Sequence, residues 1–404
     1  MTPEAASPTA AARPFVGAAR VLAGAGTSAR IGEELVATGV PAERGAVLVV
    51  VDAAVLELGL AAPALAGLDA AGFDVRIAPA VAREPTPETI TALTAAAEGG
   101  AVAAVIGIGG GSAIDAAKLA CASLTNSIPL TAGLAPTAAL SATPKLLAVP
   151  TTAGTGAEVT SVAMLWHEDR KRIFVHDRLV PSHATLDLEL LVQSPPPVTA
   201  ASGLDAISHA VESLLSTFRS PLSEARSRSA LRHLSHALPA AFAGDPTAHG
   251  EMLLGAHEGG LGLNASVAVG HSIAYAIAGQ AGLSHGVSCA MALPYCLAYC
   301  RAASERQLVE MAPWAGLDPE PKAMLDWIVE LNDELGIPGS LAEVGIVLDA
   351  IPEMAREVVE LYPRPNNPVP VELETLEALF VDFYNGHAQE AWSRHATTAG
   401  STAS

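Results

Sequence analysis

The most constraining feature of the sequence is an apolar segment, residues 102–108, that runs directly into three glycines and a helix-forming stretch. Gly109, Gly110 and Gly111 follow the segment and precede Ser112. A strand that ends in glycines at a helix N-terminus lets backbone N–H groups approach a phosphate. A tight strand-to-helix turn without a ligand is the alternative. The pattern is neither a GxGxxG fingerprint nor a Walker A loop.

Short apolar segments alternate with helical stretches over the first half of the chain. Such alternation predicts a parallel sheet that is covered by helices on both faces. The predicted strands are residues 46–51, 74–77, 102–108, 146–149 and 184–187. The predicted helices are residues 29–38, 61–71, 87–97 and 112–123.

The pattern changes at Ser194-Pro195-Pro196-Pro197, which predicts a linker because helix interiors and central strands exclude successive prolines. Beyond it the predicted elements are all helices, at residues 199–216, 222–238, 250–264, 266–279, 286–303 (kinked or broken at Pro294) and 323–335. We expect an α/β domain over residues 14–196 and an all-helical domain over 197–396. Residues 1–13 and 397–404 are predicted to be disordered.

Composition narrows the class of protein. A length of 404 residues suits two domains, and a net charge of −20 disfavours nucleic acid and anionic membranes as partners. The longest stretches without charged residues, 259–300 and 119–144, are interrupted by polar residues or prolines, so no membrane span is expected. Four cysteines and no secretory signal predict a cytoplasmic protein without a disulfide framework.

Two stretches of the helical half contain potential metal ligands at suitable spacings. Asp205 and His209 are four residues apart and would lie on one face of a helix. His271 and His285 would add two imidazoles, which gives an O/N shell suited to divalent iron or zinc. A lone histidine is more often a core or surface residue, so this hypothesis depends on all four positions together.

Two further features of the α/β half suggest a nucleotide. Residues 150–160 place hydroxyls and glycines in one loop after a predicted strand, where they would bond a phosphate, ribose or carboxamide, or simply begin a helix. Asp52 follows the strand at residues 46–51. An acid there can bind a ribose 2′-hydroxyl and favour NAD over NADP, although an ordinary helix cap is the alternative.

Four stretches resemble the iron-containing, or group III, alcohol dehydrogenases. They are GGGSAIDAAK at 109–118, AVPTTAGTGAEVT at 148–160, GLDAISHAVES at 203–213 and GHSIAYAIAGQAGLSHGVSCAMALP at 270–294. The resemblance extends from about residue 20 to about residue 368. It implies a Rossmann-like N-terminal domain, an all-helical C-terminal domain as in the dehydroquinate synthase-like fold, and an active site in the cleft between them.

The resemblance also implies roles for individual residues. The metal ligands would be Asp205, His209, His271 and His285. The residues expected to hold the pyrophosphate are Gly109, Gly110, Gly111 and Ser112, with Thr151 and Thr152 beside the nicotinamide. Asp115 and Thr155 belong to the same motifs and are also expected to contact the cofactor.

The chain departs from the family pattern at two positions. Tyr275 stands where many members have a histidine associated with the proton path, and Tyr295 replaces the histidine of a common Leu-Pro-His. A tyrosine with an ordinary pKa of about 10 is a poorer proton shuttle near neutrality. We expect Tyr275 and His271 to be the catalytic residues.

The sequence therefore predicts an alcohol dehydrogenase or aldehyde reductase that uses NAD, or NADP, and a divalent metal. Semialdehydes, hydroxy acids and phosphonoacetaldehyde-type substrates all fit, and a homodimer is expected. A metal-dependent lyase or cyclase, a maleylacetate reductase-like enzyme and a non-catalytic nucleotide-binding relative are the alternatives.

Residues 200–215 and 255–295 contain no lysine or arginine, which favours the dehydrogenase. Lys171, Arg172 and Arg178 are expected to lie on a solvated charged hairpin rather than at an acidic substrate.

Overall fold

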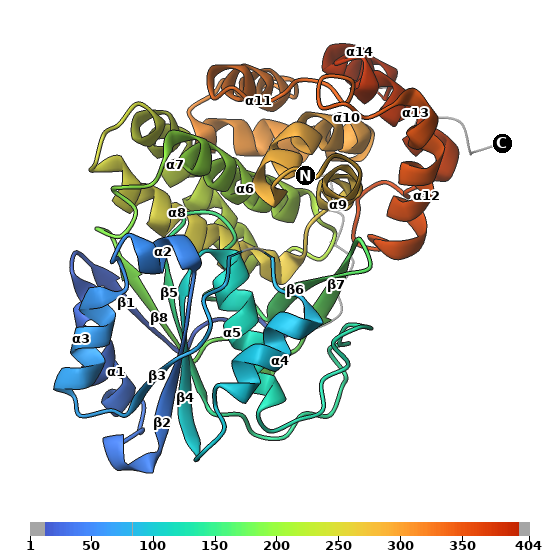
Figure 1. Ribbon diagram of the computed structural model, residues 1–404. Coiled ribbons are helices and arrows are strands. Elements are labelled where there is room, and N and C mark those ends of the chain that lie inside the picture. Colours follow the sequence, from blue (N-terminus) through green and yellow to red (C-terminus); the bar gives the residue numbers. More distant parts are fainter. Residues whose placement is uncertain (1–12, 83, 396–404) are drawn as a thin grey trace, which may run out of the picture.

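The structure is a computed structural model that describes residues 13–82 and 84–395. The segments predicted to be disordered lie outside these residues, apart from Arg13. The described chain forms an α/β half followed by an all-helical half (Figure 1).

A six-stranded parallel sheet forms the centre of the first half. Its strand order is β1-β8-β5-β4-β2-β3. The strands are β1 (Arg20–Gly24), β8 (His183–Asp187), β5 (Lys145–Pro150), β4 (Val102–Gly109), β2 (Ala46–Val51) and β3 (Val75–Ile77). All five predicted strands are confirmed, and β1 is an edge strand that the sequence pattern missed.

Helices cover both faces of this sheet, as predicted. They are α1 (Ile31–Ala37), α2 (Ala53–Glu57), α3 (Ala62–Ala70), α4 (Pro87–Ala95) and α5 (Gly111–Ser123). Alternate residues of β2 point to opposite faces. Val47 and Val49 pack in one cluster with α1 and α3, whereas Leu48 and Val50 pack in the other with α4 and α5. Burial on both faces explains why β2 is apolar throughout.

A separate two-stranded hairpin also lies in this half. It consists of β6 (Val162–His167) and β7 (Arg170–Val175), paired antiparallel. Glu168 and Asp169 form its two-residue turn with positive φ angles of 52° and 55°, as a type I′ turn requires. The buried Lys118 amine of α5 donates to the carbonyls of Thr160 and Val162 and so fixes the start of β6.

The second half is all-helical, as predicted. Its helices are α6 (Pro196–Leu215), α7 (Pro221–Phe242), α8 (Ala248–Gly262), α9 (Val269–Ala281), α10 (His285–Met311), α11 (Ala323–Glu334), α12 (Ile351–Leu361), α13 (Leu373–Tyr384) and α14 (Ala388–Arg394). The expected linker is shorter than the sequence suggested. Pro196 and Pro197 form the first turn of α6, where prolines are tolerated, and α10 continues through Pro294.

The two halves meet at the loop that follows β5. A Cβ on Gly156, whose φ is +60°, would lie 2.4 Å from Cα of Gly260 in α8, and a Cβ on Gly154 would lie 3.0 Å from Ser202 of α6. Only glycine allows this approach. The carboxyl ends of β4 and β5 therefore face the helical half, and β7 contacts α9.

Among the described residues, no single helix is long and apolar enough to cross a membrane. The bent pair Ala248–Ala265 and Val269–Ala281, which turns by 108°, meets the length and composition requirements only when its two parts are taken together.

Candidate metal and cofactor site

The side chains predicted to bind metal come from three helices of the second half. Asp205 and His209 lie one turn apart on α6, His271 lies in the first turn of α9, and His285 is the first residue of α10. The structure brings all four together. The expectation from helical spacing is met for the pair on α6.

Three imidazoles converge on one carboxylate oxygen. The Nε2 atoms of His209, His271 and His285 lie 3.6, 3.7 and 3.6 Å from Oδ1 of Asp205. The rings of His209 and His271 stack with centroids 4.8 Å apart. Donor atoms at these separations can bind a single ion between them.

Several of these atoms are buried and lack a hydrogen-bond partner within the described part of the chain. They include Oδ1 of Asp205 and Nε2 of His271. Asp205 and His271 are both 2% exposed. Buried polar atoms without partners are costly, so a group that satisfies them is expected in the functional protein. The donor set of carboxylate and imidazole fits a divalent transition metal.

Glu212 is a site residue that the sequence analysis missed. Its Oε1 atom lies 2.5 Å from Nδ1 of His271, and its Oε2 accepts a bond from the His271 backbone N–H. A carboxylate that accepts from Nδ1 leaves Nε2 of His271 unprotonated and available to a metal. Asp205, His209 and Glu212 follow at intervals of four and three residues, so the signal for one shared helix face was in the sequence.

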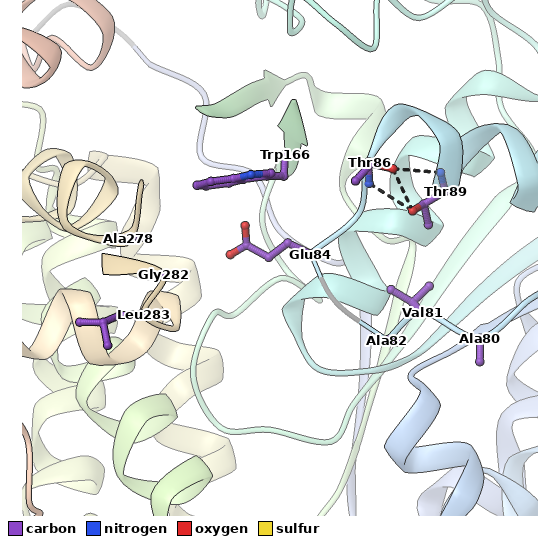
Figure 2. A pocket seen from close by; sticks show the side chains of 10 residues that line it. All are labelled: Ala80, Val81, Ala82, Glu84, Thr86, Thr89, Trp166, Ala278, Gly282 and Leu283. Atoms are coloured by element: carbon purple, nitrogen blue, oxygen red, sulfur yellow. Dashed lines mark hydrogen bonds between the residues drawn. The ribbon is translucent and has the colours of Figure 1, made fainter. Parts of the chain in front are cut away.

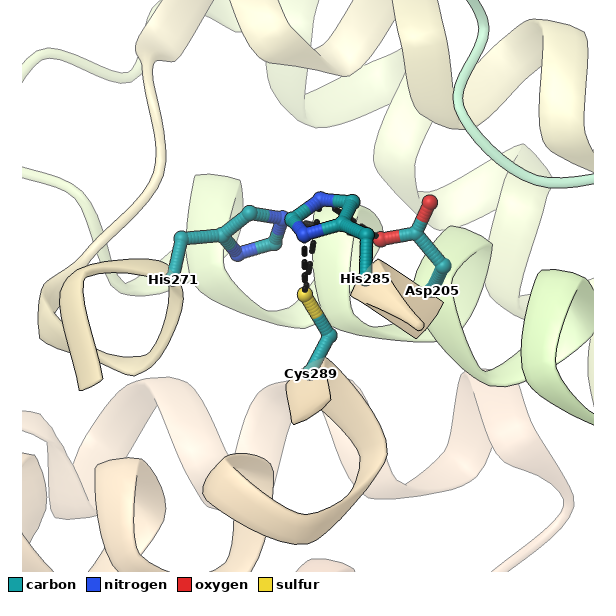
Figure 3. A group of neighbouring side chains, drawn as sticks. All are labelled: Asp205, His271, His285 and Cys289. Atoms are coloured by element: carbon teal, nitrogen blue, oxygen red, sulfur yellow. Dashed lines mark hydrogen bonds and ion pairs between the residues drawn. The ribbon is translucent and has the colours of Figure 1, made fainter. Parts of the chain in front are cut away.

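Cys289 is the second residue that the sequence analysis missed. One donor atom each from Asp205, His271, His285 and Cys289 lies within 4.8 Å of every other (Figure 3). Cys289 lies one turn after His285 on α10, and burial raises the pKa of its thiol to about 12. His209 lies beside this group through its contact with Asp205.

The protonation states of Asp205 and His285 suit metal binding. Burial alone would raise the pKa of the Asp205 carboxyl, but the imidazoles, above all those of His209 and His285, hold that pKa well below its ordinary value. Burial lowers the pKa of His285 well below its ordinary value, and the positive charge of Lys171 lowers it further. An ionised carboxylate and a neutral imidazole are the forms that bind metal.

Tyr275, predicted to be catalytic, lies directly against the side chains predicted to bind metal. Its ring stacks on that of His285 with centroids 5.7 Å apart, and it meets the ring of His271 edge-on at 6.3 Å. Tyr275 is 4% exposed. Tyr362, from the loop after α12, packs edge-on against it at 5.0 Å.

Basic side chains reach this region from outside residues 200–215 and 255–295, which contain no lysine or arginine. The Lys171 side chain is only 3% exposed, and its amine lies 5.6 Å from the centre of the Tyr275 ring. The prediction of a solvated charged hairpin is therefore wrong for Lys171. Arg364 also lies over Tyr275, at 5.8 Å. Glu84 bonds the Lys171 amine at 2.7 Å and offsets its charge.

The predicted phosphate loop has the expected form. β4 ends at Gly109 and α5 begins at Gly111, with Gly110 as the capping residue. Gly109 has a φ of +151°, and a Cβ there would lie 2.6 Å from the Cβ of Asp52. A Cβ on Gly111 would lie 2.7 Å from Thr155. Ser112 follows in the first turn of α5.

The hydroxyl-rich loop lies beside these glycines. The Thr151 N–H donates to the Gly109 carbonyl at 3.0 Å, and a Cβ on Gly110 would lie 3.3 Å from the Thr152 hydroxyl. The stretch contains no helix. The alternative of an N-capped helix start is therefore wrong, and Thr152 and Thr155 line the approach to the α5 N-terminus.

Asp52 caps a helix and also lies at the expected strand end. Its Oδ1 accepts from the N–H groups of Ala54 and Val55 at the start of α2. Oδ2 takes part in neither bond. The two interpretations of Asp52 are thus compatible, and its part in cofactor selection stays a prediction.

Asp115 has a structural contact besides its predicted cofactor role. Its Oδ2 accepts from the Met164 N–H of β6 at 2.9 Å, and its Oδ1 lies 3.8 Å from the Lys118 amine. Burial raises the pKa of Asp115 to about 6, while Lys118 acts in the opposite direction. Its contact with a cofactor stays a prediction.

A pocket of about 680 Å³ lies between the α/β half and the end of α9. Figure 2 shows Glu84 and Trp166 on one side and Leu283 on the other. Leu283 precedes His285 by two residues, and Val81 pairs with Asp52. The pocket therefore lies between the strand end that carries Asp52 and the cluster that contains His285.

Comparison with known proteins identifies the family. The model for iron-containing alcohol dehydrogenase matches residues 18–188, and the model for the C-terminal part of the Fe-containing alcohol dehydrogenase family matches residues 199–384. The chain belongs to the iron-containing alcohol dehydrogenase family and is an oxidoreductase of that family. The predicted fold class is confirmed with it.

The chain aligns with individual relatives over most of their length. The chain is 35% identical to long-chain-alcohol dehydrogenase 1 of Geobacillus thermodenitrificans (strain NG80-2) over 330 residues, which is 78% of this chain and 83% of that protein. It is 30% identical to lactaldehyde reductase of Escherichia coli (strain K12) over 349 residues, or 82% and 90%. The crystal structure of a 1,3-propanediol oxidoreductase is 25% identical, with a TM-score of 0.85 over 92% of this chain and 99% of that one.

Proposed function

We propose that the protein is a metal-dependent, NAD-linked aldehyde reductase or alcohol dehydrogenase whose metal is held by Asp205, His209, His271 and His285. The observation that carries the proposal is the convergence of three Nε2 atoms on the unpartnered Oδ1 of Asp205. Family membership as an oxidoreductase favours this over the lyase or cyclase alternative.

The reactive groups of this proposal are a divalent cation and a nicotinamide. A divalent cation polarises a carbonyl oxygen or lowers the pKa of an alcohol, and a nicotinamide gives or takes a hydride. Iron(II) and zinc both suit the oxygen and nitrogen donors. The remaining tasks, namely binding, orientation, exclusion of water and proton movement, fall to the residues of this chain.

The glycine loop and the hydroxyl loop bind and orient the cofactor in this proposal. Gly110, Gly111 and Ser112 offer backbone N–H groups at the start of α5, where the helix dipole favours a pyrophosphate. Thr152 and Thr155 line the same approach. Asp52, with Oδ2 outside its capping bonds, accepts from the ribose 2′-hydroxyl and disfavours a 2′-phosphate, so NAD is preferred over NADP.

The residues around the metal ligands hold the reacting groups. Glu212 orients His271 through Nδ1, and the ring of Tyr275 stacks on that of His285. The phenol of Tyr275 is the proton donor of this proposal.

The proposed substrate enters the pocket beside Trp166. Most of the described residues that line this pocket are small or apolar, and the charged one among them, Glu84, is paired with Lys171. An aliphatic aldehyde or semialdehyde fits this lining. Binding of a hydroxy acid or a phosphonoacetaldehyde-type substrate would require the Arg364 guanidinium to reach the acidic group of that substrate. We also propose a cytoplasmic homodimer.

Replacement of a ligand tests the proposal. We expect His285→Ala to lose both bound iron or zinc and NADH oxidation with a panel of aldehydes. His233→Ala is the control, because His233 is a partly exposed residue bonded to Glu251 on the surface. Full turnover by the His285 variant without metal would refute the proposal.

A further inference from the structure

We propose that Arg364 binds a carboxylate of the substrate, so that the enzyme acts on aldehydes that carry an acidic group at the far end of a short chain. This inference rests on the proposed function and deepens it, because it names the chemical class of the substrate. Arginine suits this task, since its planar guanidinium can donate two parallel hydrogen bonds to one carboxylate.

Arg364 lies close to the side chains predicted to bind metal. Its guanidinium carbon lies 5.8 Å from the centre of the Tyr275 ring, and that ring stacks on His285 with centroids 5.7 Å apart. A single aromatic ring therefore separates the guanidinium from one of the imidazoles. An aldehyde whose carbonyl lies at the imidazoles and whose acidic group is a few carbon atoms away can span this separation.

The proposed substrate pocket leads toward the same guanidinium. Ala278 lines the pocket, and Tyr275 and Ser272 precede it at three-residue intervals, so the three residues lie on successive turns of α9. Ser272 accepts a hydrogen bond from Nε of Arg364 at 2.8 Å. The pocket, the Tyr275 ring and the guanidinium are therefore arranged in this order along α9.

One nitrogen of the guanidinium is buried without a partner. Within residues 13–82 and 84–395, Nη2 of Arg364 is shielded from solvent and has no hydrogen-bond acceptor. The acceptor described for Nε, the Ser272 hydroxyl, is a neutral group. A buried cationic donor without an acceptor is costly, so we expect an anion beside it in the functional enzyme.

The other cation beside Tyr275 is already balanced. The Lys171 amine lies 5.6 Å from the ring centre, but it is bonded to Glu84 at 2.7 Å. Arg364 therefore carries the positive charge that a substrate can balance. One guanidinium matches the single charge of a carboxylate, whereas a phosphonate, like a phosphate monoester, carries more than one negative charge near neutrality.

The loop that carries Arg364 is anchored independently of any substrate. Nδ2 of Asn366 donates to the Val267 carbonyl at 2.8 Å, and Asn366 is buried. Ser272, the acceptor for Arg364, itself donates to the Tyr362 carbonyl at 2.8 Å. A guanidinium held in this way loses little freedom when it binds a carboxylate, which favours affinity.

The ratio of kcat/KM for a charged aldehyde to that for a neutral one tests the proposal. Succinic semialdehyde and butanal have the same number of carbon atoms, but butanal has no carboxylate. We expect Arg364→Met to lower this ratio by about 10- to 100-fold, mainly through a higher KM for succinic semialdehyde, because hydrogen bonds to a charged group are lost. Arg364→Lys should retain part of the preference, since the charge remains.

Arg356→Met is the matched control. Arg356 is an exposed residue of α12 whose Nε donates to the Pro352 carbonyl, so its loss removes one positive charge away from the site. We expect its ratio to equal that of the wild type. An equal loss of kcat/KM for both aldehydes in Arg364→Met would show a structural role and overturn the proposal. A raised KM for NADH with an unchanged aldehyde ratio would assign Arg364 to the cofactor and also overturn it.

The wild type keeps the test valid even if neither Arg364 variant folds. With metal and NADH supplied, we expect its kcat/KM for succinic semialdehyde to exceed those for butanal and phosphonoacetaldehyde by about tenfold or more. Equal values, or a preference for either of the other two aldehydes, overturn the role of Arg364 and leave the proposed function standing. A metal-loaded wild type that reduces neither charged nor neutral aldehydes overturns both.

Discussion

Nδ1 of His271 lies 2.5 Å from Oε1 of Glu212, and both residues are buried. This contact determines which ring nitrogen of His271 faces Asp205. It also places an extra carboxylate on the same face of α6 as Asp205 and His209.

Removal of the Glu212 charge should weaken metal binding. We expect Glu212→Gln to reduce metal affinity by about 10- to 100-fold, because the residue that orients a metal-binding histidine contributes that much. Metal titration of the depleted protein measures the effect. Glu251→Gln is the control, since Glu251 makes a similar contact with His233 on the surface. Equal affinities for the two variants would contradict the role of Glu212.

Asp52 allows its capping role and its charge to be separated. Asp52→Asn keeps a good N-cap for α2, whereas Asp52→Ala removes the cap and should cost about 1 kcal/mol of unfolding free energy. We expect both variants to lower the ratio of kcat/KM for NADH over NADPH by about tenfold, the equivalent of about 1.4 kcal/mol. An unchanged ratio in Asp52→Asn would show that Asp52 is only a cap.

Two adjacent glycines should give opposite results when replaced by alanine. Gly109→Ala should destabilise the fold by about 1–3 kcal/mol, because φ is +151° and the new Cβ would clash with Asp52. Gly110→Ala has an ordinary φ of −75° and should fold normally but weaken NADH binding. Denaturant unfolding and NADH titration measure the pair. Normal NADH affinity in Gly110→Ala would argue against the phosphate loop.

Asp115 should make stability depend on pH. The native carboxyl, with its pKa raised from 3.8 to about 6, binds a proton more tightly than in the unfolded chain. Its contribution to stability is therefore present below about pH 4 and is lost as the pH rises through about 6. We expect the wild type to lose about 3 kcal/mol relative to Asp115→Asn over this range. If the difference in unfolding free energy between the wild type and Asp115→Asn were the same below about pH 4 as above about pH 6, the raised pKa would be contradicted.

The sequence predicted the strands in which every residue is buried, because such strands are apolar throughout. The strand at residues 46–51 is buried on both faces and is apolar throughout. Strand β1 lies at the sheet edge with exposed residues, and β7 begins Arg170-Lys171-Arg172, so neither has such a pattern. Spacing alone could not show that Lys171 is buried, because that depends on contacts with Glu84 and Tyr275.

Residues of the site could likewise be predicted only where a local sequence pattern relates them. Asp205 and His209 are related by helical periodicity, which the sequence displays. Cys289 stands in a long uncharged stretch, where a buried thiol is the ordinary expectation, and only the packing of α6, α9 and α10 places its sulfur beside His285.

Metal depletion of the wild-type protein tests the central claim most directly. Chelator-treated protein should lose NADH oxidation with its best aldehyde, and iron(II) or zinc should restore the activity with a stoichiometry of one ion per chain. The carboxylate and imidazoles around Asp205 predict this dependence. Full turnover by the metal-free protein would contradict the account.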